Sequence, residues 1–180
     1  TKRGGKLIVM DPRGQALKRH ASHMLQFRPG TDVSMLNAIM HVIVEEKLYD
    51  QQYIEAYTEN WEIEKAHLKT FTPEKMSKIC GIDAEVLRDV ARTFAGANAA
   101  MIFWGMGISQ HIHGTDNSRC LISLALMTGQ IGRPGAGLHP LRGQNNVQGA
   151  SDAGLIPMFL PDYQPVSDDG VRSAFTEVWQ

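Results

Sequence analysis

Short continuous apolar runs alternate with helical patterns along this chain, and that alternation narrows its possible folds more than any other feature. Residues 6–10 read KLIVM, a run of the kind that a parallel sheet buries on both faces, and the turn residues DPRG end it at positions 11–14. The patterns predict further strands over residues 24–27 and 99–104. Since parallel strands need crossover connections, the helical segments between these runs favour a parallel sheet.

The helical patterns begin and end at recognisable capping residues. One helix is predicted from Thr31 or Asp32 to about Glu46, with apolar residues at helical spacing. Residues 50–96 read as a series of short helices, and further helices are predicted over residues 15–23, 115–127 and 171–179. The sequence therefore predicts an α/β fold of three layers. Its sheet is expected to be mostly parallel, incomplete and Rossmann-like, with helices on both faces.

Charge and hydropathy exclude several classes of protein. The 18 Lys and Arg residues nearly balance 19 Asp and Glu residues, so no bulk field favours nucleic acid, and no nucleic-acid partner is expected. With 43% hydrophobic residues, the 180-residue chain is long enough for one globular domain. No apolar run approaches the ~20 residues needed to span a bilayer. We therefore expect a soluble chain without a membrane segment and predict a cytoplasmic location.

The residues that bind metals or act as nucleophiles form no known motif. Cys80 and Cys120 lie far apart, which excludes a self-contained zinc or iron–sulfur site and indicates buried thiols. His111 and His113 alternate without a third ligand, so a solvated loop pair is favoured over a metal site. The sequence contains no Walker loop, no Gly-x-Ser-x-Gly and no His-Glu-x-x-His, so nothing indicates a hydrolase.

Residues 128–154 show no periodicity and hold seven of the 17 glycines. A loop of this length is too long for a routine connection, which favours a functional role. Within it, residues 141–149 read LRGQNNVQG. The guanidinium of Arg142 presents a planar fork that matches a carboxylate in two parallel hydrogen bonds. A lone loop arginine is more often a surface charge, but the amides and glycines beside Arg142 suit a large polar ligand.

Three other segments have both a structural and a functional interpretation. Asp11 either belongs to a simple turn or ends a strand where ribose hydroxyls or a purine edge bind. Residues 29–32 read PGTD, which is either a helix cap or a helix N-terminus that grips a polar ring. Residues 105–107 read GMG between a strand and a helix. Gln110 stands where the dinucleotide fingerprint has its third glycine, so this is a poor Rossmann fingerprint.

Taken in order, four segments resemble a known family: VMDPRG, LQFRPGTD, IFWGMGISQ and SLALMTGQIGRPGAGLHPLRGQNNVQGASDAG. They resemble the large subunit of molybdopterin-dependent formate dehydrogenases, within the bis-molybdopterin guanine dinucleotide oxidoreductases. The resemblance covers residues 6–165 or so. It implies oxidation of formate to CO2 at a molybdenum or tungsten centre held by bis-molybdopterin guanine dinucleotide. It also implies electron-transfer subunits or domains as partners, and a [4Fe-4S] cluster whose ligands lie outside this chain.

Carried over by position, the resemblance makes Arg142 the catalytic arginine that faces formate. The residues it places in contact with the cofactor are Asp11, Arg13, Gly30, Asp32, Gly105, Met106, Gly107, Gln110, Gly143 and Gln144. The family's cysteine- or selenocysteine-histidine pair, its cysteine-rich segment and the first strand of its nucleotide-binding domain have no match here.

We therefore expect residues 1–180 to be a fragment of the catalytic domain, inactive by itself, with residues 128–154 as a long cofactor-facing loop. Two alternatives stay open. One is a sister molybdopterin oxidoreductase with another substrate, and the other is a non-catalytic nucleotide-binding module.

Overall fold

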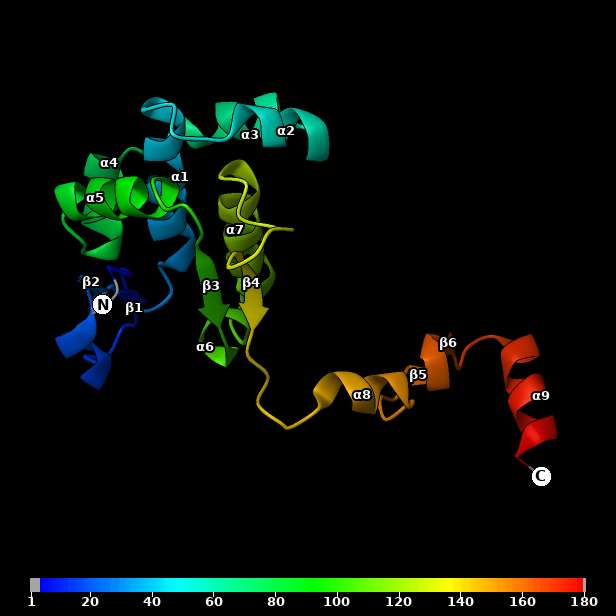
Figure 1. Ribbon diagram of the computed structural model, residues 1–180. Coiled ribbons are helices and arrows are strands. Elements are labelled where there is room, and N and C mark those ends of the chain that lie inside the picture. The colour runs from blue at the N-terminus through cyan, green and yellow to red at the C-terminus, as the bar shows by residue number, and fades with distance from the viewer. Residues whose placement is uncertain (1–3, 180) are drawn as a thin grey trace. The chain divides into compact units, whose positions relative to one another are not determined.

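The computed structural model describes residues 4–179, and the chain divides into two compact units, Thr1–Leu141 and Arg142–Gln180 (Figure 1). The elements of the first unit, in order, are β1 (Ile8–Met10), a 3₁₀ helix (Ala16–His20), β2 (His23–Leu25), α1 (Asp32–Glu45), α2 (Gln51–Tyr57), α3 (Trp61–Leu68), α4 (Pro73–Cys80), α5 (Ala84–Ala95), β3 (Met101–Trp104), α6 (Met106–Ser109), α7 (Gly114–Met127) and β4 (Gly137–Pro140).

Helix α1 is the centre of the first unit and packs against α3, α4, α5 and α7. Leu36, Ile39 and Ile43 are each 1% exposed or less, because apolar residues cover most of this helix rather than a single stripe. Complete burial of each such side chain contributes roughly 2 kcal/mol. The core that forms around α1 also includes residues from β1, β2, β3 and β4.

Helix boundaries agree with the capping residues in the sequence. Thr72 accepts a hydrogen bond from the amide of Lys75 at the start of α4, and Gly81 ends that helix at a φ of 78°. Asp83 caps α5 by accepting from the amide of Glu85. Local capping chemistry therefore sets the start of both helices and the end of α4.

The parallel α/β character is confirmed, although the strands pair in twos. Strand β1 pairs with β2 in parallel, and β3 pairs with β4 in parallel. No strand within residues 4–179 joins the two pairs into the single expected sheet.

Residues 128–154, predicted as a long cofactor-facing loop, are irregular only in part, and the role of this segment toward a cofactor stays a prediction. This range contains β4 and, in the second unit, the short helix α8 (Val147–Asp152). The sequence of β4, GLHP, has low strand propensity, and its extended form depends on the pairing with β3.

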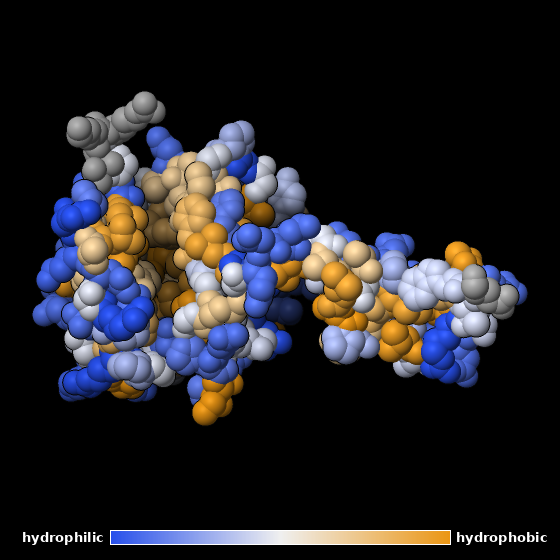
Figure 2. Space-filling view, turned by 90° about the horizontal axis from the view of Figure 1, so that it is seen from below, coloured by the Kyte–Doolittle hydropathy of each residue, from blue (hydrophilic) through white to orange (hydrophobic). Residues whose placement is uncertain are grey.

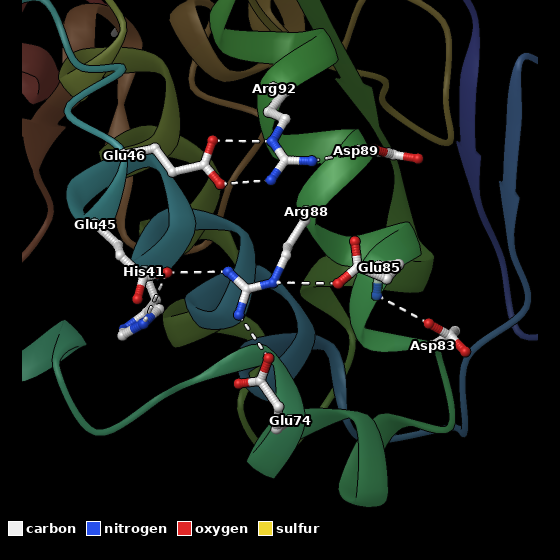
Figure 3. A network of polar contacts seen from close by, with 9 residues as sticks. All are labelled: His41, Glu45, Glu46, Glu74, Asp83, Glu85, Arg88, Asp89 and Arg92. Atoms are coloured by element: carbon white, nitrogen blue, oxygen red, sulfur yellow. Dashed lines mark hydrogen bonds and ion pairs between the residues drawn. The ribbon is translucent and has the colours of Figure 1, made fainter.

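Ion pairs tie α5 to its neighbours (Figure 3). The guanidinium of Arg88 donates to Glu45 of α1 at 3.0 Å and to Glu74 of α4 at 2.5 Å. Arg92 donates to both carboxylate oxygens of Glu46, at 2.9 and 2.8 Å. The Arg88 side chain is 17% exposed, so these bonds are partly shielded from water. These ion pairs connect α5 with α4 and with the end of α1.

The second unit contains α8, an antiparallel pair of β5 (Phe159–Leu160) and β6 (Gln164–Pro165), and α9 (Asp169–Val178). A short 3₁₀ helix (Pro161–Tyr163) connects the two strands. None of residues 142–179 is buried in this structure. Across the described chain, the helices are all too short or too polar to cross a membrane.

Candidate cofactor and substrate site

The turn after β1 holds Asp11 and Arg13. The carboxylate of Asp11 accepts from the amide of Arg13 at 2.7 Å and from the side-chain nitrogen of Gln15 at 2.8 Å. These bonds fix a tight turn, as the structural interpretation of DPRG predicts. The Arg13 side chain is 85% exposed, so its guanidinium is accessible to an anionic ligand at the carboxyl end of the strand.

The turn after β2 leads into α1. Gly30 adopts a φ of 78°, and the Thr31 hydroxyl donates to the carbonyl oxygen of Arg28 at 2.6 Å. A Cβ added at Gly30 would meet no heavy atom within 4 Å, so there is open space beside this turn. Because β1 and β2 are parallel, the two turns lie at the same edge of the pair.

Asp32 is the first residue of α1 and is only 4% exposed. Burial raises its pKa, while a hydrogen bond with its own backbone amide and the charge of His111 act in the opposite direction. No side chain within residues 4–179 donates a hydrogen bond to its carboxylate. The hydrogen-bond partner of this carboxylate is its own backbone amide, and a carboxylate has further lone pairs that can accept from the N–H groups of a ligand.

The GMG turn follows β3. Gly105 precedes the single helical turn α6, and Gln110 ends it with an amide that donates to the carbonyl oxygen of Met106 at 2.9 Å. A Cβ at Gly107 would also meet nothing within 4 Å. The packing of the chain therefore does not require glycine at this position, and the space beside it is free for a ligand.

These turns lie at one end of the first unit. His111, in the loop after α6, is close enough to Asp32 for its charge to lower the pKa of that carboxyl. Figure 1 places β1, β2 and α6 at the lower end of this unit. Figure 2 looks onto that end and shows a hollow with apolar walls between the two sides of the unit. The turns after β1, β2 and β3, which hold the predicted cofactor residues of the first unit, therefore lie at the same end of that unit (Figure 1).

The other predicted residues belong to the second unit. Arg142, Gly143 and Gln144 are exposed, and no ion pair of Arg142 is present within the part of the chain that the structure describes. A side-chain hydrogen bond with Asp152 raises the pKa of Tyr163, and the positive charge of Arg142 acts in the opposite direction. The arginine fork is therefore available to an external carboxylate.

The cysteines are buried free thiols, as predicted. Desolvation raises the pKa of Cys120 to about 12, which disfavours the thiolate that metals and electrophiles require. Among residues 4–179 there is no group of three His, Cys, Asp or Glu side chains that could hold a metal ion.

Arg28 is a positioning residue that the sequence did not indicate. Its guanidinium donates to the carbonyl oxygens of Lys78 and Ile79, at 2.7 and 3.2 Å, at the end of α4. This contact anchors the turn that holds Gly30. Arg28 and Lys78 are 50 residues apart in the sequence, so no short sequence pattern could predict this contact.

Comparison with known proteins shows which protein family this chain is similar to. A family model described as molybdopterin oxidoreductase matches residues 1–172. The chain is 44% identical over 178 residues to "F420-dependent formate dehydrogenase subunit alpha" of Methanocaldococcus jannaschii, covering 99% of this chain and 26% of that protein. It is 43% identical over 176 residues to "Formate dehydrogenase H" of Escherichia coli, covering 98% of this chain and 25% of that protein.

A solved structure is similar as well. Acetylene hydratase from Pelobacter acetylenicus matches with a TM-score of 0.72 and 30% sequence identity, over 74% of this chain and 18% of that one. The chain spans about a quarter of the length of the curated relatives described above.

Proposed function

The chain belongs to the molybdopterin oxidoreductase family, and from that premise we propose that it is part of the catalytic subunit of a formate dehydrogenase. In this proposal it supplies part of a guanine dinucleotide pocket and the arginine that binds formate. The observation that carries the proposal is the similarity to formate dehydrogenase alpha subunits over nearly the whole chain. The accessible Arg142 fork supports it.

The pocket residues of the first unit suit a guanine dinucleotide. The buried carboxylate of Asp32 accepts from the N–H groups of a guanine ring, and Arg13 pairs with a phosphate or ribose at the neighbouring turn. Gly30, Gly105 and Gly107 let the backbone approach the ligand closely. When bound, bis-molybdopterin guanine dinucleotide with molybdenum or tungsten supplies the two-electron redox chemistry.

Arg142 orients the substrate in this proposal. Formate yields CO2, one proton and two electrons. A [4Fe-4S] cluster, whose ligands would lie outside this chain, would pass these electrons to electron-transfer subunits or domains. Two parallel hydrogen bonds from Arg142 fix both oxygens of formate and leave its C–H bond directed away from the arginine. Gly143 and Gln144, directly after it, contact the cofactor.

The test is Arg142→Lys in the full-length subunit. Lysine keeps the charge but loses the fork, so formate oxidation should fall by about 10²–10³-fold while the pterin content stays the same. Arg119→Lys, at an exposed arginine outside the segments assigned to the cofactor, is the matched control and should leave the rate unchanged. Unchanged formate oxidation in Arg142→Lys would disprove this role.

A second candidate is a sister molybdopterin oxidoreductase with another substrate. The similarity to acetylene hydratase favours keeping it, because that structure shares the fold and 30% of the aligned residues. A turnover assay that compares formate with other small substrates separates the two. The cytoplasmic location predicted from the sequence stays a prediction.

A further inference from the structure

The first turn of α7 packs directly on the end of α6. Asn117 is 2% exposed, and its side-chain nitrogen donates to the carbonyl oxygen of Ile108 at 2.9 Å. The backbone amide of Asn117 donates to the carbonyl oxygen of His113 at 2.8 Å. The second of these is the helical bond of the first turn of α7, so the side chain of Asn117 ties the start of α7 to the end of α6.

Gly114 lies one helical turn before Asn117, on the same face of α7. A Cβ at Gly114 would lie inside the van der Waals contact distance of the Ser109 carbonyl oxygen. That oxygen is backbone, so it has no flexible side chain that could move aside. Only glycine allows α7 to approach α6 this closely.

This contact matters because α6 is too short to be stable as an isolated helix. It is a helix of only four residues, and its last carbonyl groups have no partners within the helix. Asn117 satisfies one of them. Within residues 4–179, it is the one side chain outside residues 105–113 that bonds to the backbone of that segment. The Ile108 side chain packs against the core, and most other residues of the segment are exposed, with Ile112 99% exposed.

We infer that Asn117 is a positioning residue, which with Gly114 holds the GMG turn in the shape that accepts the cofactor. Neither residue touches the ligand. Asn117 acts through the Ile108 carbonyl, and Gly114 allows the close approach. That the GMG turn accepts a cofactor rests on the proposed function. That Asn117 and Gly114 hold residues 105–113 in place follows from the contacts alone.

The experiment compares Asn117→Asp and Asn117→Ala in the full-length subunit. Asn117→Asp keeps the size of the side chain but removes the donor and sets a carboxylate against a carbonyl oxygen. Hydrogen exchange of the amides of residues 105–113 should accelerate at least tenfold in both variants, with the amides of α1 unchanged. Pterin content should fall several-fold. Thr115→Ala, exposed in the same helical turn, is the control and should change neither readout.

Two hydrogen-exchange results would overturn the inference. One is unchanged exchange of residues 105–113. The other is an equal acceleration in α1, which would show a general structural role.

Gly107→Val separates this inference from the proposed function. The valine enters open space in the protein alone but occupies the proposed ligand volume. Loss of pterin in Gly107→Val, with full retention in both Asn117 variants, would overturn the positioning role and leave the cofactor site intact. Full pterin retention in all three variants would contradict the cofactor site itself.

Discussion

At the scale of single residues, Asp32 shows a conflict between stability and binding. Its carboxylate is buried, and desolvation raises its pKa despite the opposing backbone hydrogen bond. A carboxyl with a raised pKa holds its proton more tightly in the folded state than in the unfolded state. The ionised group therefore destabilises the fold at neutral pH. Such a group is expected where a ligand, rather than the fold, needs the charge.

Asp32→Asn should therefore stabilise the protein at pH 7, by up to roughly 1 kcal/mol in the free energy of unfolding. The gain should shrink as the pH falls through the raised pKa of the folded state and disappear below the reference value of 3.8. Thermal unfolding at pH 7 and at pH 3.5 measures it. The same substitution should lower the content of guanine dinucleotide. A variant less stable than the parent at pH 7 would contradict this account.

Residue type alone indicated part of the site. Arg142 and Asp32 carry chemistry that short motifs display, and the sequence singled out both. The sequence did not predict a role for Arg28 or Asn117. Their partners are backbone carbonyl groups of other elements, and only the folded chain brings those carbonyl groups near them. Arg142 and the cofactor residues remain predictions until their variants are measured.

At the scale of elements, the helices follow local rules and the strands do not. Thr72 and Asp83 cap their helices with side-chain hydrogen bonds, so α4 and α5 begin where the sequence predicts. Strand β4 escaped prediction because GLHP has no alternation of apolar and polar residues. Its backbone is extended because β3 offers hydrogen-bonding partners from Met101 to Trp104. Non-local pairing of this kind leaves no signal in a short window.

The ion pairs of Arg88 lead to a prediction about the stability of the packed helices. Arg88→Met keeps most of the aliphatic chain but leaves Glu45 and Glu74 without their shared cation, so the free energy of unfolding should fall by about 1–2 kcal/mol. Urea unfolding at pH 7 measures it. Arg119→Met is the control, because the Arg119 side chain is 74% exposed in its pair with Asp116, and it should change stability by less than about 0.5 kcal/mol.

The effect of Arg88→Met should depend on pH. The hydrogen bond from Arg88 lowers the pKa of Glu74 below its reference value of 4.5. A carboxyl with a lowered pKa stabilises the fold above the unfolded value, and this contribution disappears as the pH falls through the folded value. The parent and the variant should therefore converge in stability in acid. A difference that stays constant down to pH 2 would contradict the role of this ion pair.

At the scale of the whole molecule, the alternation of strands and helices predicted the α/β class and the parallel pairing correctly. The division into two units was not predicted. The glycine-rich composition of residues 128–154 does not indicate at which residue the chain ceases to pack against the core of the first unit. None of residues 142–179 is buried, whereas α1 in the first unit has nine buried residues. Family membership was predicted from ordered motifs and is confirmed by the family model over residues 1–172.

We propose that this chain forms part of a formate-oxidising molybdopterin site. The most direct measurement is an anaerobic titration of the full-length native subunit with formate, after its guanine dinucleotide and metal content have been determined. We predict a bound pterin guanine dinucleotide with molybdenum or tungsten, and two electrons gained per formate consumed. A subunit that carries this cofactor but takes no electrons from formate would contradict the claim and favour a sister enzyme with another substrate.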